Sequence, residues 1–359
     1  MFTKNNISTL LLFIGTILSI GHLFTACNAP SVSPTPYILS KPNGFVAMVV
    51  PKDNPTTYEG IALGRRLFFD PVLSGNQSIS CAHCHQPALA FTDASATSSG
   101  SVGINGSRSA PSLLNIGFHY KGVFWDGRSP NLEDQALHPI RDSVEMKGDW
   151  VKIIQLLENG DDYPGLFEKA FGHKKINKNL VAKALAQFQR TLLSFDSKFD
   201  RVMREETTFT KNEKRGWTIF FDAGYPNTPM AECSHCHSDP LFTNLEFTNN
   251  GIDSSYNLLT FPDAGLGEIT GNKYDNGKFR TPTLRNIAVT APYMHDGRFK
   301  TLEEVIDHYN TGGHYSPNKN PNVKPLDLTA KDKADLILFL NTLTDSVALQ
   351  QETYFAPIN

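Results

Sequence analysis

The chain has 359 residues, with 33 Lys and Arg against 36 Asp and Glu, so its formal net charge is -3. This length accommodates two domains of ordinary size. The near-neutral balance, without a cluster of basic residues, argues against a nucleic-acid-binding protein.

The N-terminus carries the features of an export signal. Lys4 precedes an apolar stretch from Ile7 to Phe24, and Leu23-Phe24-Thr25-Ala26-Cys27 resembles a bacterial lipobox. Residues 1–27 are therefore predicted to be a signal peptide and lipobox, with Cys27 lipidated. The alternatives are an uncleaved transmembrane anchor and cleavage with release. All three place the folded part in the cell envelope, facing the periplasm, and the lipid at Cys27 is the only expected membrane contact.

Residues 28–55 are rich in Pro and Ser, which predicts an extended tether rather than a packed element. The rest of the chain is expected to form an N-terminal domain over residues 56–205 and a C-terminal domain over residues 206–359.

Two Cys-x-x-Cys-His pentapeptides are the most informative motifs of the chain. Each supplies two thiols that can add to the vinyl groups of a haem, followed by a His that can bind the iron. Paired Cys-x-x-Cys units of a zinc site usually lie roughly 15 to 20 residues apart, much closer than these. The sequence predicts two covalently bound haem c groups, with two proximal His ligands. The attachment residues are Cys81, Cys84, His85, Cys233, Cys236 and His237.

The chain also repeats itself, which predicts its architecture. Four blocks occur in the same order in both halves, and the duplication predicts two cytochrome c-like haem domains in tandem. The blocks of the first half begin at Gly64, Cys81, Pro111 and Trp125. Their counterparts in the second half begin, in the same order, at Gly216, Cys233, Pro282 and His295.

The expected fold class is mostly α. Apolar residues recur at helical spacing near the end of each half, and Thr329 is a plausible N-cap for the second of these helices. The sequence has no clean alternation of apolar and polar residues, which is the pattern that would predict a sheet. Residues 249–278 have no counterpart in the first half and are expected to form a long loop. Three histidines outside the haem motifs are expected at the surface or in loops: His119, His173 and His314.

The two halves differ in what they offer as a sixth iron ligand. The second half contains Met294, His308 and Tyr309, whereas the first half has no evident ligand. It carries Gln135 and Glu145 instead. A carboxylate near an open haem face can move a proton between the two oxygens of a peroxide. From the residues alone, a solvated surface carboxylate is the alternative for Glu145.

These motifs resemble those of the bacterial dihaem cytochrome c peroxidase family, and more closely its MauG-like branch, over essentially the whole mature chain. The stretches that carry the resemblance include both haem motifs, Arg108–Pro111, Phe124–Arg128, Val144–Met146, Arg280–Asn286 and Ala291–Gly297.

The resemblance implies a peroxidatic N-terminal haem and an electron-transfer C-terminal haem. It makes His85 and His237 the proximal ligands and Trp125 the aromatic residue between the haems. It also makes Glu145 the distal acid–base residue, with Gln135 in the same pocket. A calcium ion between the domains is a further expectation, held by the carbonyl oxygens of Thr290 and Pro292, although Ser109 stands where the family has Asn.

Two departures from the ordinary peroxidases matter. Their loop after the first haem motif contains a His that caps the first haem, but residues 98–107 contain no His. The first haem is therefore expected to be open at rest. The distal ligand of the second haem is expected to be Tyr309, as in MauG-like proteins, where the ordinary family has Met. The alternatives are Met294 and His308.

The leading functional prediction is a dihaem peroxidase that reduces hydrogen peroxide at the N-terminal haem, with electrons relayed through the C-terminal haem. The alternatives are MauG-like oxidation of a partner protein's side chain through a high-valent dihaem state, and a plain dihaem electron-transfer protein. The expected partners are hydrogen peroxide and either a small redox protein donor or a protein substrate.

Overall fold

The computed structural model describes residues 33–42, 44–221 and 228–357. Cys27 and the predicted signal peptide lie outside these residues. In the part of the chain that is described, none of the helices is long and apolar enough to cross a membrane.

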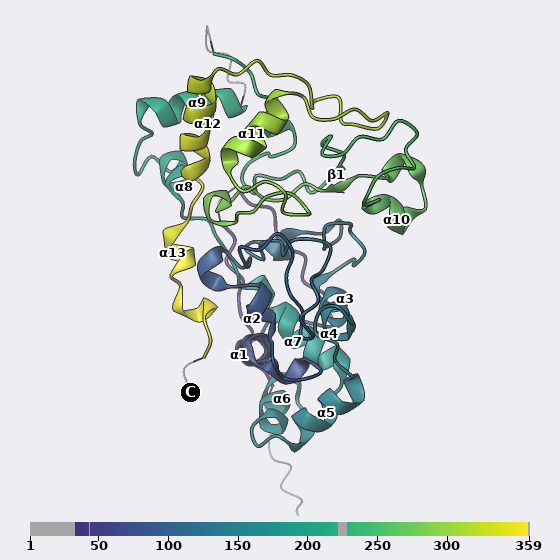
Figure 1. The fold of residues 1–359 in the computed structure, drawn as a ribbon. Coiled ribbons are helices and arrows are strands. Elements are labelled where there is room, and N and C mark those ends of the chain that lie inside the picture. The colour runs from purple at the N-terminus through teal and green to yellow at the C-terminus, as the bar shows by residue number, and fades with distance from the viewer. Residues whose placement is uncertain (1–32, 43, 222–227, 358–359) are drawn as a thin grey trace, which may run out of the picture. The chain divides into compact units, whose positions relative to one another are not determined.

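Helices form nearly all the regular secondary structure of the described residues, which agrees with the predicted mostly α fold class (Figure 1). A short antiparallel pair is formed by β1 (Phe247–Thr248) and β2 (Phe279–Arg280). The helices before residue 195 are α1 (Tyr58–Phe69), α2 (Cys81–Cys84), α3 (Leu132–Gln135), α4 (Leu137–Arg141), α5 (Trp150–Asn159), α6 (Tyr163–Phe171) and α7 (Lys178–Arg190). Those that follow are α8 (Lys198–Met203), α9 (Lys211–Phe221), α10 (Leu266–Thr270), α11 (Leu302–Asn310), α12 (Ala330–Asn341) and α13 (Ser346–Leu349).

The core of the first half is built on the crossing of α1 and α7. The crossing is close because Gly64 has no side chain: a Cβ at this position would collide with the carbonyl oxygen of Ala184. Phe68 and Phe188 are buried beside it and their rings contact edge to face.

The core of the second half repeats this arrangement with α9 and α12. A Cβ at Gly216 would collide with the carbonyl oxygen of Asp335. The predicted N-cap of α12 is present, since the Thr329 side chain accepts a hydrogen bond from the Asp332 amide in a capping box. Such matching crossings are expected from two copies of one domain, but tandem duplication itself stays a prediction.

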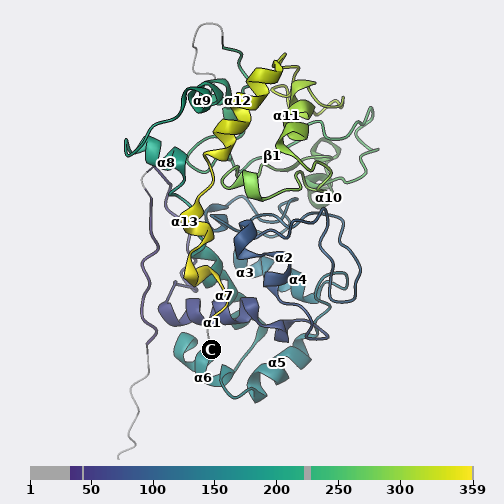
Figure 2. The same cartoon turned by 60° about the vertical axis from the view of Figure 1, so that its left-hand side comes forward.

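Several residues pack across the expected domain boundary. Phe199 of α8 belongs to the second core, whereas Ala348 and Tyr354, near the C-terminus, belong to the first. Figures 1 and 2 show α13 between α12 and α1 in both views. The expected tether also differs from a free spacer, because Phe45 is buried against Phe118.

Residues 249–278 form mainly a loop, as expected, but it contains the short helix α10. This helix follows Gly265 and ends at Thr270, and the next residue, Gly271, has the positive φ of 67° that commonly follows the end of a helix.

Candidate haem sites

His85 is oriented as a proximal iron ligand. Its Nδ1 lies 2.8 Å from the carbonyl oxygen of Phe91. Because a carbonyl can only accept, Nδ1 carries the proton and Nε2 keeps its lone pair for a metal. Burial lowers the pKa of His85, so the ring is neutral. Phe91 has φ 61°, a conformation that non-glycine residues seldom adopt.

His237 has the same arrangement in the second half. Its Nδ1 lies 3.1 Å from the carbonyl oxygen of Phe242, which has φ 54°. Burial lowers the pKa of His237 to about 4. Each motif therefore presents a neutral imidazole. In both, a backbone carbonyl holds the ring in place, and that carbonyl belongs to a residue with positive φ a few positions further along the chain.

In each haem motif the two thiols lie on one short turn together with the His. Cys81 and Cys84 bound α2, and Cys233 begins a 3-10 turn. Burial raises the pKa of Cys81 to about 12 and that of Cys84 to about 11. The placement of each thiol pair beside its His suits covalent attachment of a haem.

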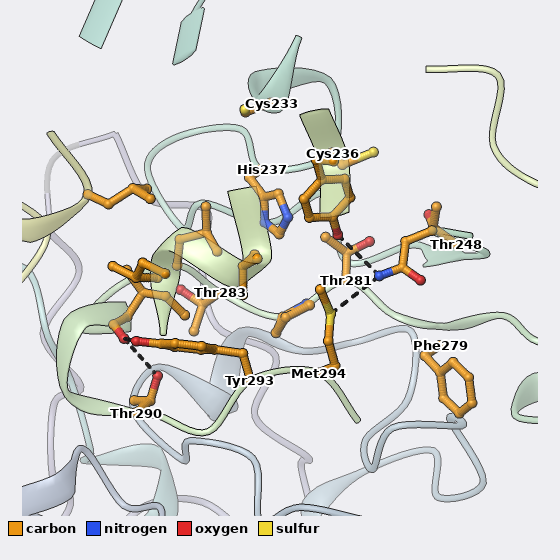
Figure 3. A pocket seen from close by; sticks show the side chains of 18 of the residues that line it. Cys233, Cys236, His237, Thr248, Phe279, Thr281, Thr283, Thr290, Tyr293 and Met294 are labelled. Carbon is orange, nitrogen blue, oxygen red and sulfur yellow. Dashed lines mark hydrogen bonds between the residues drawn. The ribbon is translucent and has the colours of Figure 1, made fainter. Parts of the chain in front are cut away.

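A cavity in the second half is lined by His237, Cys236, Met294 and Tyr309 (Figure 3). Its walls are largely apolar. Residues that form them include Phe220, Tyr293, Leu302, Ile306, Leu336 and Leu340. An apolar cavity with a fixed imidazole on its wall fits a haem.

Arg280 gives an independent test of that fit. It lines the cavity and is buried, with Nη1 2.7 Å from His119 Nδ1 and Nε donating to the carbonyl oxygen of Phe124. Within the described residues it forms no ion pair with a carboxylate. A buried cation is costly without an anion, and a haem brings carboxylates in its propionate groups. Arg280 therefore fits a haem propionate.

His119 lies in a loop, as one of the two expected alternatives had it, but it is buried, so the expectation of a surface position is wrong. Burial and the charge of Arg280 hold the pKa of His119 well below its usual value. The neutral ring can accept the hydrogen bond from Arg280. That partner lies 161 positions further along the chain, which explains why local sequence around His119 did not reveal the burial.

Two of the three alternative sixth ligands line the cavity. Asn250 Nδ2 lies 3.2 Å from Tyr309 Oη and 3.4 Å from Met294 Sδ. The Met294 side chain faces the His237 ring in Figure 3. His308 is not among the lining residues, and its Nε2 lies 3.0 Å from the carbonyl oxygen of Asn250. Sequence reasoning missed Asn250 because the residue falls in the expected loop.

Glu145 lies between α4 and α5, close to the first haem motif. Its charge is among the causes that raise the pKa values of Cys81 and Cys84, after burial as the main cause. The pKa of Glu145 is itself raised, mainly by burial and then by the charge of Asp142. Glu145 also lines an open polar pocket with Arg128 and His138, whereas Gln135, at the end of α3, does not line it.

The loop of residues 98–107 packs directly on the Glu145 segment. The Ser101 amide donates to the carbonyl oxygen of Glu145 at 2.7 Å. Gly100 permits this approach, since a Cβ there would collide with the carbonyl oxygen of Val144. The loop without His is thus held beside the expected distal residue.

Trp125 lies at the contact between the two halves and lines the second-half cavity. Its Nε1 donates to the carbonyl oxygen of Ser109 at 2.9 Å. Ser109 in turn donates from its amide to the carbonyl oxygen of His295 and from Oγ to that of Met294. The Arg280 amide donates to the carbonyl oxygen of Trp125. Ser109 therefore fixes the indole of Trp125, and Arg280 of the second half fixes its backbone.

Thr290 and Pro292, expected to bind calcium through their carbonyl oxygens, line the same cavity. No geometry in the described residues tests calcium binding, so this site stays a prediction.

Comparisons with known proteins agree with this geometry. Residues 58–208 match the family model of the di-haem cytochrome c peroxidases. The chain is 37% identical to the methylamine utilization protein MauG of Methylorubrum extorquens over 300 residues, which covers 82% of this chain and 80% of that protein. It is 35% identical to the cytochrome-c peroxidase IdrP1 of Pseudomonas sp. (strain SCT), with 84% of each chain covered.

A solved structure of a MauG-like protein associated with microbial copper homeostasis superposes with a TM-score of 0.81 at 36% identity, covering 89% of this chain and 99% of that chain. The chain belongs to the di-haem cytochrome c peroxidase and MauG family. Membership implies two c-type haems, which agrees with the two motifs.

Proposed function

We propose that this protein is a peroxidase that reduces hydrogen peroxide at the haem held by His85, with electrons relayed through the haem held by His237. The observation that carries the proposal is Glu145, a carboxylate with a raised pKa beside a haem motif that has no evident sixth ligand. Each haem, when bound, supplies an iron that can exchange electrons, and the first also supplies the site for peroxide.

The chain's own residues then handle protons and orientation. The Phe91 carbonyl holds His85 in one tautomer, so that Nε2 is always the free nitrogen. Glu145 takes a proton from one peroxide oxygen and delivers it to the other, which leaves as water. Two electrons and two protons convert hydrogen peroxide to two water molecules.

Trp125 is proposed as the aromatic residue between the two haems. Its hydrogen bond to Ser109 fixes the indole at the contact between the halves. Tyr309 is proposed as the sixth ligand of the second haem, supported by its place on the cavity wall that it shares with His237. A Tyr ligand lacks the potential-raising effect of Met ligation, so the second haem is expected to favour its oxidised states.

A second candidate function is oxidation of a partner protein's side chain. It is favoured by Tyr309 on the cavity wall and by the absence of His from residues 98–107. Sequence identity does not favour either function, because a MauG is 37% identical to this chain and a cytochrome-c peroxidase is 35% identical to it.

The test begins with the EPR spectrum of the fully ferric, purified protein. We expect one high-spin signal, from the open first haem, and one low-spin signal. Glu145→Gln is expected to keep both signals and to lose peroxide turnover with a small redox donor. Two low-spin signals without a high-spin component would contradict the proposal, because the first haem would then be capped.

We also propose that the protein faces the periplasm and is lipid-anchored at Cys27. The lipobox-like stretch of residues 23–27 supports this placement. Mass spectrometry of the mature N-terminus tests it, since a diacylglyceryl group on the Cys27 thiol is expected and a mature chain without that lipid would contradict the anchor.

A further inference from the structure

Asn250 contacts both side chains that compete for the sixth position of the second haem. Its single amide nitrogen lies 3.2 Å from Tyr309 Oη and 3.4 Å from Met294 Sδ (Figure 3). All three residues line the cavity that contains His237. Tyr309 and Met294 are thus close enough to share one donor group.

The orientation of the Asn250 amide follows from its other contact. Its Oδ1 accepts a hydrogen bond from the Ile252 amide at 3.2 Å. A flipped amide would place its NH2 group against that N–H, donor against donor. The NH2 end therefore faces Tyr309 and Met294, and its two N–H bonds can serve one acceptor each.

The backbone of Asn250 is fixed relative to α11, the helix that carries Tyr309. The carbonyl oxygen of Asn250 lies 3.0 Å from Nε2 of His308, the residue before Tyr309. The next residue, Gly251, accepts a hydrogen bond from the His314 amide at 2.7 Å. The amide donor thus cannot drift away from Tyr309 without breaking contacts to the helix and to the segment after it.

We propose that Asn250 is a positioning residue that selects Tyr309 over Met294 as the sixth ligand of the second haem, an inference that rests on the proposed function. One N–H stabilises negative charge on the phenol oxygen, because hydrogen bonds to charged acceptors are stronger than those between neutral groups. The other N–H occupies the thioether sulfur, a weak acceptor whose lone pairs are the ones needed to bind iron. Both effects favour Tyr309.

Two variants of the holoprotein separate this role from a structural one. Asn250→Leu removes both donors and the acceptor for Ile252. Asn250→Asp keeps that acceptor and replaces the N–H donors with a carboxylate oxygen, which also adds a negative charge. Asn257→Leu is the control, since Asn257 accepts from the Leu259 amide in the same kind of local turn but is exposed and does not line the cavity. Haem content and the intensity of the high-spin signal report whether each variant is folded and loaded.

The readouts are the low-spin EPR signal and the far-red charge-transfer absorption that marks methionine bound to ferric haem. We expect the wild-type low-spin signal to lose most of its intensity in both Asn250 variants. In Asn250→Leu we expect the methionine absorption to appear and the reduction potential of the second haem to rise. Adding Met294→Leu should abolish that absorption, and Asn257→Leu should resemble the wild type.

The outcomes distinguish the two proposals. Methionine absorption in the wild type would overturn both the Tyr309 assignment and the selection by Asn250. A wild type that loses its low-spin signal in Tyr309→Phe would support the assignment. If the Asn250 variants then kept the wild-type signal, only the selection would be overturned. Wild-type spectra in Asn250→Asp together with altered spectra in Asn250→Leu would also overturn it, because the turn alone would then explain the effect.

Discussion

Arg280 and His119 share a buried contact in which Nη1 of the guanidinium lies 2.7 Å from Nδ1 of the imidazole. Two groups that are both cations when protonated can share such a contact only if one is neutral. Burial lowers the pKa of Arg280 only to about 10, whereas that of His119 falls well below its usual value. The pair is thus a charged donor and a neutral acceptor, and it makes stability depend on pH.

The first prediction concerns acid stability. In the unfolded chain the pKa of His119 is about 6.5, but in the folded protein its ring stays neutral. Below that pH the unfolded state binds one more proton, so the free energy of unfolding falls as the pH falls. His119→Gln keeps an acceptor for Arg280 and removes this proton. Between pH 6.5 and pH 5 the free energy of unfolding of the wild type should fall by about 2 kcal/mol more than that of the variant.

Guanidinium unfolding of the two holoproteins at several pH values measures this difference. Other buried histidines titrate equally in both proteins, so they cancel in the comparison. Parallel pH profiles would show that His119 is not held neutral.

The second prediction concerns the charge of Arg280. A cation beside a haem favours the reduced iron, so Arg280→Gln should lower the reduction potential of the second haem. A loss of about 1.4 kcal/mol corresponds to about 60 mV for one electron. Arg298→Gln is the control, because Arg298 is already paired with Asp253 and Asp296. Spectroelectrochemical titration should show a shift in the first variant and little change in the second.

The third prediction concerns Glu145. As a base it must be ionised, so kcat/KM for peroxide should fall as the pH falls through its raised pKa. Glu145→Gln should reduce kcat/KM by about 10²–10⁴-fold. Asp142→Asn removes one cause of the raised pKa and keeps the acceptor for the Val144 amide. The acid limb of the profile should then move to lower pH, and an unmoved limb would assign the titration to another group.

The fourth prediction concerns the C-terminal segment. The Leu193 amide donates to Tyr354 Oη at 2.8 Å, and the single hydroxyl proton has two acceptors within reach, the carbonyl oxygens of Leu193 at 2.8 Å and Thr191 at 3.1 Å. Tyr354→Phe leaves these buried groups without their partner, so it should lower the free energy of unfolding by about 1–3 kcal/mol. Tyr256→Phe, at a side chain that is 81% exposed, should change it by less than about 0.5 kcal/mol. Equal changes in the two variants, measured by denaturant titration, would show that the hydrogen bonds of Tyr354 do not stabilise the fold.

Local signals in the sequence were enough for part of this structure. The Cys-x-x-Cys-His motifs predicted which thiols and imidazoles lie together, because all their residues fall on one turn. Thr329 predicted the start of α12, because a capping side chain bonds only to the next few amides. The roles proposed for Tyr309 and Glu145 rest on the family resemblance, since nothing local in the sequence relates either residue to a haem.

Contacts between distant segments could not be predicted from one sequence. The Arg280–His119 pair joins residues from different halves, and Asn250 meets Tyr309 across 59 positions. Tyr354 enters the core of the first half although it follows the last helix of the second. Each of these contacts depends on how the chain returns on itself, which hydrophobic spacing within an element does not encode.

The last prediction concerns the two helix crossings, of which the α9–α12 crossing forms part of the wall of the second-half cavity. Gly64 and Gly216 face backbone carbonyl oxygens of α7 and α12, so a methyl group at either position must push two helices apart. Gly64→Ala and Gly216→Ala should each lower the free energy of unfolding by about 1–3 kcal/mol.

Gly165 of α6 is the matched control, because nothing lies within 4 Å of the position its Cβ would take. Ala is a better helix former than Gly, so Gly165→Ala should raise stability by about 0.4–1 kcal/mol. Steric crowding at a crossing lowers the free energy of unfolding, whereas the better helix propensity of Ala raises it, so the sign of the change shows which effect dominates. Because the α9–α12 crossing contributes Phe220, Leu336 and Leu340 to the cavity wall, Gly216→Ala should also broaden the low-spin EPR signal. Gly64→Ala should leave that signal unchanged, and the reverse pattern would contradict the assignment of the second haem to this cavity.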